Sequence, residues 1–444
     1  MALGGGTFTV QNKVLPGSYI NFVSASGTSN VFGERGTGAV GMSLDWCDGT
    51  IHRVTKEDFQ KKSLSIFGYE YGAEKLAWAR DFFKNGKTLI FAGLNTNGAV
   101  KAKNEYCTAK YYGTRGNSLK IVVENNVDES GYKDVSVYLD TTLVSKYTVT
   151  NDGLSLNDIE DDYVAFNVSS GESGVMSNTA GTLLTGGVNG SVTGTEVQNF
   201  LSGLESYSFN AMTTWGYEDE LVLEWTKRMR DEVGKKFQCV VYDVKNADYE
   251  GCVVVPGADE GDFDNTLPWV CGALAGCAIN ESLTNKVYDG EFLSQEEALE
   301  YASNYSQTEL EELINKGYFT FHRVGDEVRV LTDINSLVET TENKGEIFKE
   351  NQTVRVCDQI ANDIATIFNT YYLGKVQNDE AGRSAFKSEI VKHHNKLMDL
   401  RAIENFSSED VTVEQGDTKR SVVVTDNVTI VNAMEQLYMT VVIE

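Results

Sequence analysis

The chain has 444 residues, 41% of them hydrophobic, and a chain of this length usually divides into about two to four domains. Its formal charge of −27 comes from 65 acidic against 38 basic residues without a basic stripe, so direct nucleic-acid binding is not expected. No run of about 18 apolar residues predicts a membrane span, and the first residues lack the basic and apolar regions of a signal peptide.

The seven cysteines are scattered, odd in number and without a Cys-x-x-Cys pair. Most have apolar neighbours, as in Gly251-Cys252-Val-Val. We therefore expect reduced, buried thiols of a cytoplasmic protein and not a disulfide framework.

Residues 1–20 are predicted to form an arm with a β-strand in it. Three glycines at 4–6 form a flexible joint, and a Pro-Gly turn follows at 16–17. Between them lie the alternating residues of the strand, Thr7, Phe8, Thr9 and Val10. Because no partner hairpin is near in sequence, this strand must pair with a distant segment or with another chain.

Residues 21–98 are predicted as a segment that packs with the core, with a strand at 39–46, a helix at 73–84 and a strand at 88–92. Residues 99–181 contain short alternating runs separated by Asn, Asp and Gly, which is typical of a small inserted antiparallel β domain.

From residue 182 to 340 helix and strand patterns alternate, which predicts an α/β core. The expected elements are helices at 195–206 and 218–233, strands at 208–214, 237–243 and 253–256, a buried helix at 266–280 and a hairpin at 318–331. Residues 341–425, with a long helix at 351–373, are predicted as a C-terminal α+β domain. The fold class is thus a mixed α/β and α+β multidomain protein.

Residues 426–444 are predicted as a second arm. Its strand covers 437–443 and includes Tyr438, Met439, Thr440, Val441 and Val442. Two strand candidates at opposite chain ends favour β-augmentation, in which an extended segment joins the sheet edge of another subunit. The alternative, that both ends pair within their own chain, remains open on these residues alone.

Two glycine motifs resemble nucleotide-binding loops. Residues 36–41 spell Gly-x-Gly-x-x-Gly, but the residues that follow have a strand pattern where a dinucleotide site needs a helix. Gly86-Lys87-Thr88 ends like a Walker A loop, yet Asp81 stands where its first glycine should be. We expect a glycine-rich strand at the first and a helix C-terminus at the second.

The remaining polar groups predict no catalytic, cofactor or metal site. His393 and His394 are adjacent, so on a helix they point in different directions and cannot chelate one metal ion. His322 is expected to be an ordinary strand residue, and no serine has a nucleophile-elbow context. The acidic clusters at 158–162 and 259–264 lack the glycine and terminal glutamate of an EF-hand and are expected to be solvated loops, with a weak divalent-ion site as the alternative.

Eight segments in chain order resemble the contractile tail sheath proteins of bacteriophages and phage-derived bacteriocins, especially the PBSX type of defective prophage. They include Leu15-Pro-Gly-Ser-Tyr-Ile-Asn-Phe22, Thr108-Ala-Lys-Tyr-Tyr-Gly-Thr-Arg-Gly-Asn117 and Val431-Asn-Ala-Met-Glu-Gln-Leu-Tyr-Met439. The others are at 35–40, 184–190, 271–282, 332–336 and 372–378. The resemblance covers nearly the whole chain.

The resemblance implies a structural subunit that stacks as six-membered rings around an inner tube and contracts to drive that tube through a bacterial envelope. The arms 1–20 and 426–444 would join sheets of neighbouring subunits. The implied partners are other copies of this chain, the tube protein, the baseplate and the tail terminator. It further implies a subtilisin-like architecture for residues 182–340, assembly in the bacterial cytoplasm, a place in a virion or bacteriocin tail, and no cofactor.

Basic residues, among them Arg355, Lys375 and Arg383, gather in the C-terminal part, while residues 150–350 are rich in acids. We expect the basic part to meet acidic surfaces of the tube or the next ring, with Lys387, Lys392 and Lys396 as candidate contacts; solvated helix faces are the alternative. Two other functions remain as alternatives: a cytosolic α/β enzyme of hydrolase type, and another phage shell or tube component.

Overall fold

The computed structural model describes residues 32–169, 174–257 and 263–443. The chain divides into two compact units: a larger one of residues 34–361 with the segment from 430 onward, and a smaller one of residues 362–429 with the residues up to Gly33. Helix α8 (Asn351–Ile367) begins in the larger unit and ends in the smaller. Within the described ranges, no helix has the length and apolarity needed to cross a bilayer.

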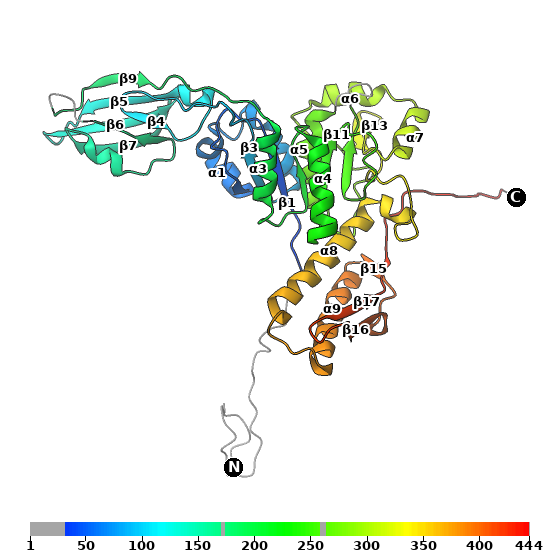
Figure 1. The fold of residues 1–444 in the computed structure, drawn as a ribbon. Helices are drawn as coiled ribbons and strands as arrows, with labels where there is room; N and C mark the ends of the chain where they lie inside the picture. Colours follow the sequence, from blue (N-terminus) through cyan, green and yellow to red (C-terminus); the bar gives the residue numbers. More distant parts are fainter. Residues whose placement is uncertain (1–31, 170–173, 258–262, 444) are drawn as a thin grey trace, which may run out of the picture. The chain divides into compact units, whose positions relative to one another are not determined.

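A six-stranded sheet forms the centre of the larger unit, with the strand order β12-β11-β10-β1-β3-β2. Figure 1 labels three of its strands, β1, β3 and β11. Neighbouring strands are parallel except for β2, which is antiparallel to β3. The strands are β1 (Thr37–Met42), β2 (His52–Thr55), β3 (Thr88–Gly93), β10 (Ala211–Thr213), β11 (Gln238–Tyr242) and β12 (Cys252–Val255). Strands from residues 37–93 thus share one sheet with strands from the predicted α/β core.

Both faces of this sheet are buried, because successive strand residues enter different hydrophobic clusters. Val40 lies in the cluster that includes residues of helices α1 (Lys56–Phe67), α2 (Ala77–Asn85) and α5 (Leu267–Gly276). Ala39, its neighbour, lies in the cluster with residues of α3 (Gly194–Leu204) and α4 (Asp219–Lys227). The result is a three-layer arrangement in which helices cover the two faces of a mostly parallel sheet.

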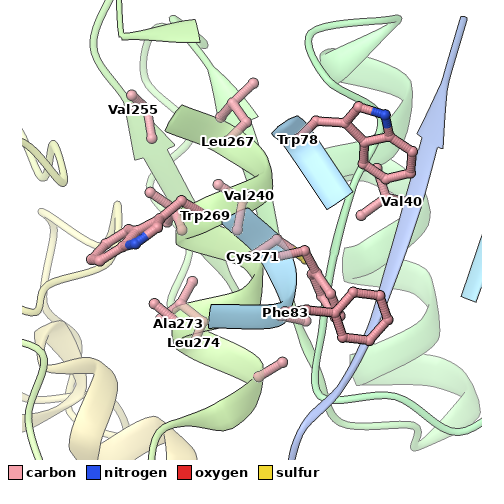
Figure 2. Packing of buried hydrophobic residues seen from close by; sticks show 14 of the residues in the cluster. Val40, Trp78, Phe83, Val240, Val255, Leu267, Trp269, Cys271, Ala273 and Leu274 are labelled. Carbon is pink, nitrogen blue, oxygen red and sulfur yellow. The ribbon is translucent and has the colours of Figure 1, made fainter. Parts of the chain in front are cut away.

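Helix α5 is apolar around its whole circumference and nearly all of it is buried, as the sequence predicted (Figure 2). Its Trp269 and Cys271 pack among strand residues such as Val240. A Cβ atom at Gly272 would lie 2.3 Å from the carbonyl oxygen of Phe82 in α2. The two helices can therefore approach this closely only with glycine at that position.

The Gly-x-Gly-x-x-Gly motif leads into β1, so the predicted glycine-rich strand is confirmed and the dinucleotide-binding alternative is wrong. The predicted continuation of this strand to residue 46 is wrong, because β1 ends at Met42 and a loop follows. The second glycine of the motif has a packing function, because a Cβ atom at Gly38 would lie 2.4 Å from the ring of Phe82. The motif therefore allows α2 to pack directly onto the sheet.

The Gly86-Lys-Thr segment is also explained by structure. Gly86 is the C-cap of α2, its N–H donates to the carbonyl of Phe82, and Lys84 is in the last turn of the helix. Thr88 then begins β3. The helix terminus predicted from the sequence is confirmed.

Residues 107–183 form antiparallel strands, as the alternating pattern predicted. A four-stranded sheet has the order β7-β6-β5-β9, and β4 pairs with β8. The strands are β4 (Cys107–Ala109), β5 (Leu119–Asn125), β6 (Tyr132–Leu139), β7 (Thr142–Thr150), β8 (Val164–Phe166) and β9 (Thr179–Leu183). They enclose a core of their own that contains Ile121, Val135 and Val137.

Three further helices and a hairpin complete the larger unit. Helix α1 was missed by the sequence prediction, although Thr55 caps its N-terminus and Gly68, at φ 77°, ends it. Capping boxes begin α6 (Gln295–Ser303) and α7 (Gln307–Asn315). The predicted hairpin is formed by β13 (Phe321–Val324) and β14 (Glu327–Val330), and His322 is a strand residue as expected.

The smaller unit is built on the end of α8, a following π-helical turn at Phe368–Tyr372, and helix α9 (Glu380–Asp399). Its strands are β15 (Ile403–Glu404), β16 (Val411–Gln415), β17 (Val422–Asp426) and β18 (Thr429–Ile430). β16 and β17 form an antiparallel pair. All seven cysteines of the chain are free and six are buried, as predicted.

A buried carboxyl group in the first turn of α4 makes the stability of the larger unit depend on pH. Asp219 accepts a hydrogen bond of 2.7 Å from the N–H of Tyr242, and burial raises its pKa to about 6. Between roughly pH 4 and pH 6 the folded chain therefore holds a proton that the unfolded chain has lost, so this group's contribution to stability falls as the pH rises.

We expect wild type to lose about 1–2 kcal/mol relative to Asp219→Asn between pH 5 and pH 7.5. The amide is neutral at every pH, so the variant lacks this contribution. The measurement is the free energy of unfolding of both proteins across that range. Glu220→Gln, which removes an exposed charge from the same turn, is the control. The prediction is contradicted if the difference in unfolding free energy between wild type and Asp219→Asn stays constant with pH, or if wild type gains stability relative to the variant as the pH rises.

Candidate assembly surfaces

The C-terminal segment is held on the larger unit by the first turn of α8. The side-chain amide of Gln352 donates to the carbonyl of Val431 at 3.2 Å and accepts from the N–H of Ala433 at 2.9 Å. The side chains of Thr353 and Asn432 hydrogen-bond to each other at 3.2–3.3 Å. Side-chain hydrogen bonds thus hold residues 431–433 in place, although these residues form neither helix nor strand.

Glu435 also anchors this segment. Among the described residues, it makes the anchoring contact nearest the C-terminus. Its carboxylate accepts hydrogen bonds from three hydroxyl groups: Ser282 at 3.2 Å, Thr284 at 2.6 Å and Thr332 at 3.3 Å. Burial, followed by the charges of Glu435 and Asp333, raises the pKa of the nearby Glu350. Repulsion between the carboxylates of Glu350 and Glu435 therefore works against this anchor when both are ionised.

Beyond Glu435 the chain exposes a row of large apolar side chains. The exposed fractions are 84% for Leu437, 88% for Tyr438, 82% for Val442 and 89% for Ile443. Met439 and Val441 are exposed as well. Single exposed apolar residues are normal on a folded protein, whereas a contiguous row of this kind is rare.

The strand predicted for residues 437–443 is not formed within this chain, where residues 431–443 have neither helix nor strand. The physical reason is that no sheet edge among the described residues pairs with this segment, and a single strand has no partner for its backbone hydrogen bonds. The N-terminal arm residues Thr7, Phe8, Thr9 and Val10 lie outside the described residues.

The three candidate lysines all lie on α9, but not on one face of it. Lys392 and Lys396 are four residues apart and are neighbours on the helix surface, whereas Lys387 is rotated by about 140° from Lys392. Lys392 pairs with Glu389 at 2.8 Å, and the ammonium of Lys396 lies 5.8 Å from the ring centre of Phe32. Lys392 is exposed, with 55% of its side chain accessible, whereas Lys387 and Lys396 are partly buried.

The expected concentration of basic charge in the C-terminal part needs correction. Arg355 is buried and pairs with Asp333 at 2.7 Å, so it cannot contact a tube or another ring from that position. Arg383 donates to the carbonyl of Asn378 at 3.1 Å. Residues 362–429 carry eight lysines and arginines against eleven acids, so the smaller unit is less acidic than the rest but not basic.

The two adjacent histidines pair with different aspartates of the smaller unit. His393 contacts Asp363 at 2.9 Å and His394 contacts Asp426 at 2.8 Å, each through its Nε2 atom. Across the part of the chain that the structure describes, no three His, Cys, Asp or Glu side chains are grouped as metal ligands.

The anchor of the C-terminal segment was missed by the sequence analysis. Its residues come from three separate parts of the chain, at 282–284, 332 and 350–353, and meet residues 431–435 only after folding. Serine, threonine and glutamate at these positions look like ordinary surface residues, so no local pattern could have identified them.

Three family profiles match the chain in consecutive blocks. The phage tail sheath protein beta-sandwich domain matches residues 96–189, the central domain residues 190–336, and the C-terminal domain residues 343–444. A solved sheath tail protein from Desulfitobacterium hafniense is 31% identical, with a TM-score of 0.78 over 95% of this chain and 99% of that one. The chain belongs to the phage tail sheath protein family.

Three further proteins are similar to this chain over nearly its whole length. The phage-like element PBSX protein XkdK of Bacillus subtilis is 29% identical over 99% of both chains. A sheath tail protein of Listeria innocua is 27% identical, with a TM-score of 0.75 over 92% of this chain and 95% of that one. The helical sheath of the anti-feeding prophage in its contracted state shares the fold at 10% identity, with a TM-score of 0.53 over 97% of this chain and 99% of that one.

Proposed function

We propose that this tail sheath protein is a non-enzymatic structural subunit that polymerises around an inner tube as stacked rings of six. Contraction of the assembled sheath then drives the tube through a bacterial envelope. The observation that carries the proposal is the exposed apolar segment 436–443 behind the Glu435 anchor, in a chain that belongs to the sheath family. Energy stored in the lattice would make a nucleotide or other cofactor unnecessary.

The arms at both chain ends are the proposed links between subunits, with residues 436–443 as the part of the C-terminal arm that crosses. In an extended strand Leu437, Met439, Val441 and Ile443 lie on one face, and an added strand would bury this face. The N-terminal residues 7–10 are proposed to act in the same way. Such an exchange gives heterologous contacts, which generate rings and helices.

We propose the β16–β17 pair as an acceptor of an arm from another copy. A two-stranded sheet is only marginally stable by itself. Each face of the pair has an exposed valine, with exposed fractions of 52% at Val423 and 36% at Val424. Strands from other subunits would enlarge the sheet and cover these valines.

The remaining parts of the proposal concern partners and place. The inner tube protein, the baseplate and the tail terminator are the proposed partners, and the host cytoplasm is the proposed site of assembly for a virion or bacteriocin tail. For the α/β layer we propose a subtilisin-like architecture, supported by parallel strands with helices on both faces. That likeness would concern architecture alone, since fold does not carry activity.

Electron microscopy of the purified chain in negative stain tests the proposed function. We expect ordered hollow tubes that show six-fold symmetry in end-on views. Uniform monodisperse particles at all concentrations would favour the alternative of an α/β enzyme. Closed shells, or tubes too narrow to surround another tube, would favour a capsid or tube component.

The charge hypothesis for α9 predicts that Lys387→Glu with Lys392→Glu stops assembly in the extended state. Reversing both charges would replace attraction to acidic surfaces by repulsion, in a protein that already carries a net charge of −27. The measurement is the yield of sheath on preformed tubes at low and high salt. Lys419→Glu with Arg420→Glu, an exposed basic pair of the same unit, is the control. Normal sheath formation by the α9 variant would contradict the hypothesis.

A further inference from the structure

A cavity of about 760 Å³ opens at the carboxyl end of the central sheet. It is lined by Met42, the last residue of β1, by residues 43–45 that follow, and by residues 215–217 after β10. β1 and β10 are neighbours in the sheet, but the chain continues from β1 to β3 on one side and from β10 to β11 on the other. In open parallel sheets this switch point is where connecting loops separate and ligands bind.

Aromatic side chains dominate the walls of this cavity. They are Phe67, Tyr69, Trp78, Trp215, Tyr217 and Phe292. The rings of Trp215 and Phe292 pack edge to face, with centroids 4.7 Å apart. Trp78 is 1% exposed, and its Nε1 has no hydrogen-bond partner in the part of the chain that the structure describes. A buried indole N–H normally has one, so the Trp78 side chain contributes to the wall through its ring and not through this buried donor.

The charge of the cavity is acidic. Asp45, Glu74 and Asp264 line it against a single base, Lys75. The face of Tyr69 already carries a cation, because the guanidinium of Arg115 lies 4.4 Å from its ring centre. No glycine-rich turn leads from β1 into a helix N-terminus here, so the arrangement that holds phosphates in this fold class is missing from the cavity.

The loop that carries Trp215 is held in an unusual conformation. Trp215 and Glu218 have positive φ angles of 52° and 54°, which side chains of L-amino acids rarely adopt. The N–H of Trp215 donates to the hydroxyl of Thr213 at 3.1 Å, and the hydroxyl of Thr214 donates to the carbonyl of Tyr217 at 2.7 Å. These bonds hold Trp215 at the cavity in spite of its unfavourable φ angle. Residues held in such strained conformations cluster at ligand-binding sites.

From this combination we propose that the cavity binds a small organic cation, an ammonium or guanidinium compound. The aromatic faces attract the cation, since their electron density is concentrated above the ring plane. Asp45, Glu74 and Asp264 supply the opposite charge. The site is separate from the arms and goes beyond the proposed role in sheath assembly.

Choline and its neutral analogue 3,3-dimethylbutan-1-ol test the proposal, because they share shape and hydroxyl group and differ in charge. The readouts are isothermal titration calorimetry and tryptophan fluorescence of the purified full chain. We expect saturable binding of choline, weaker by about tenfold for the neutral analogue. Equal binding of both compounds, or no binding of choline and of arginine methyl ester, overturns the proposal. Preferential binding of a neutral sugar such as glucose also overturns it.

Two variants locate the site. Trp215→Leu and Glu74→Gln are each expected to weaken choline binding by at least about threefold, through loss of a ring face and of a charge. Tyr132→Leu and Glu129→Gln remove an exposed ring and an exposed charge elsewhere and should bind choline as wild type does. Unchanged thermal unfolding establishes that each variant is folded. Equal choline binding by all four variants would show that the compound binds outside this cavity and would overturn the assignment.

Discussion

A chain that ends at Gln436 is expected to fold normally and to fail to polymerise. Residues 437–443 are exposed and make no described contact with the rest of the folded units, so their removal should leave the unfolding temperature within about 1 °C of wild type. In the assembled sheath the same residues would be buried. Since burying one large apolar side chain contributes about 1.5–3 kcal/mol, losing four of them should raise the critical concentration by more than about 100-fold.

Sedimentation and electron microscopy measure this effect, and matched substitutions show whether a strand is involved. Serine at Leu437, Met439 and Val441 changes one face of an extended segment, and serine at Tyr438, Thr440 and Val442 changes the other. The first set should impair polymerisation more strongly, because that face is entirely apolar. Tubes of normal diameter and stability formed by the truncated chain would refute the proposed exchange of C-terminal arms. Removal of residues 1–20 is the parallel test of the N-terminal arm.

Arg355→Met is expected to lower the stability of the larger unit by about 3–5 kcal/mol, because it leaves the carboxylate of Asp333 buried without its cation. Both side chains of this pair are 1% exposed. Asp333 also accepts hydrogen bonds from the N–H of Leu283 at 3.0 Å and from the amide of Asn351 at 2.9 Å. One carboxylate thus connects three segments of the core.

The same substitution should loosen the C-terminal segment. The N–H of Asp333 donates to the hydroxyl of Thr284 at 2.9 Å, and that hydroxyl donates to Glu435 at 2.6 Å. Displacement of Asp333 therefore disturbs the anchor, and hydrogen exchange at residues 432–435 should become faster. The control is Arg329→Met, which breaks the more exposed pair with Glu327 and should cost less than about 1 kcal/mol. Equal losses for the two variants would contradict the role of the buried pair.

Local signals were sufficient for many elements of this fold. The strand at β1 was predicted despite its nucleotide-like glycine spacing, because a strand pattern continues where a dinucleotide fold needs a helix, although β1 ends at Met42. The apolar circumference of α5 predicted its burial, and the alternation in residues 119–150 predicted antiparallel strands. Helix α1, which was not predicted, has local signals of the same kind, since Thr55 caps its N-terminus and Gly68 ends it.

Long-range relations were beyond the sequence. Arg355 was grouped with surface cations, because a charged side chain in a helix looks the same whether its partner is solvent or a buried aspartate. The cavity at the switch point combines residues from 42 to 292, and no segment by itself indicates it. The hydroxyls that hold Glu435 are equally scattered.

The sequence by itself determined the elements of each layer and, through the order of its motifs, the resemblance to tail sheath proteins. Periodicity and capping act within a few residues, so they can be recognised from the sequence alone. Only the tertiary structure decided that the C-terminal arm is anchored as far as Glu435 and exposed beyond it, and that β1 and β10 meet at an aromatic cavity. These features depend on which distant surfaces meet, and that is set by the packing of the whole core.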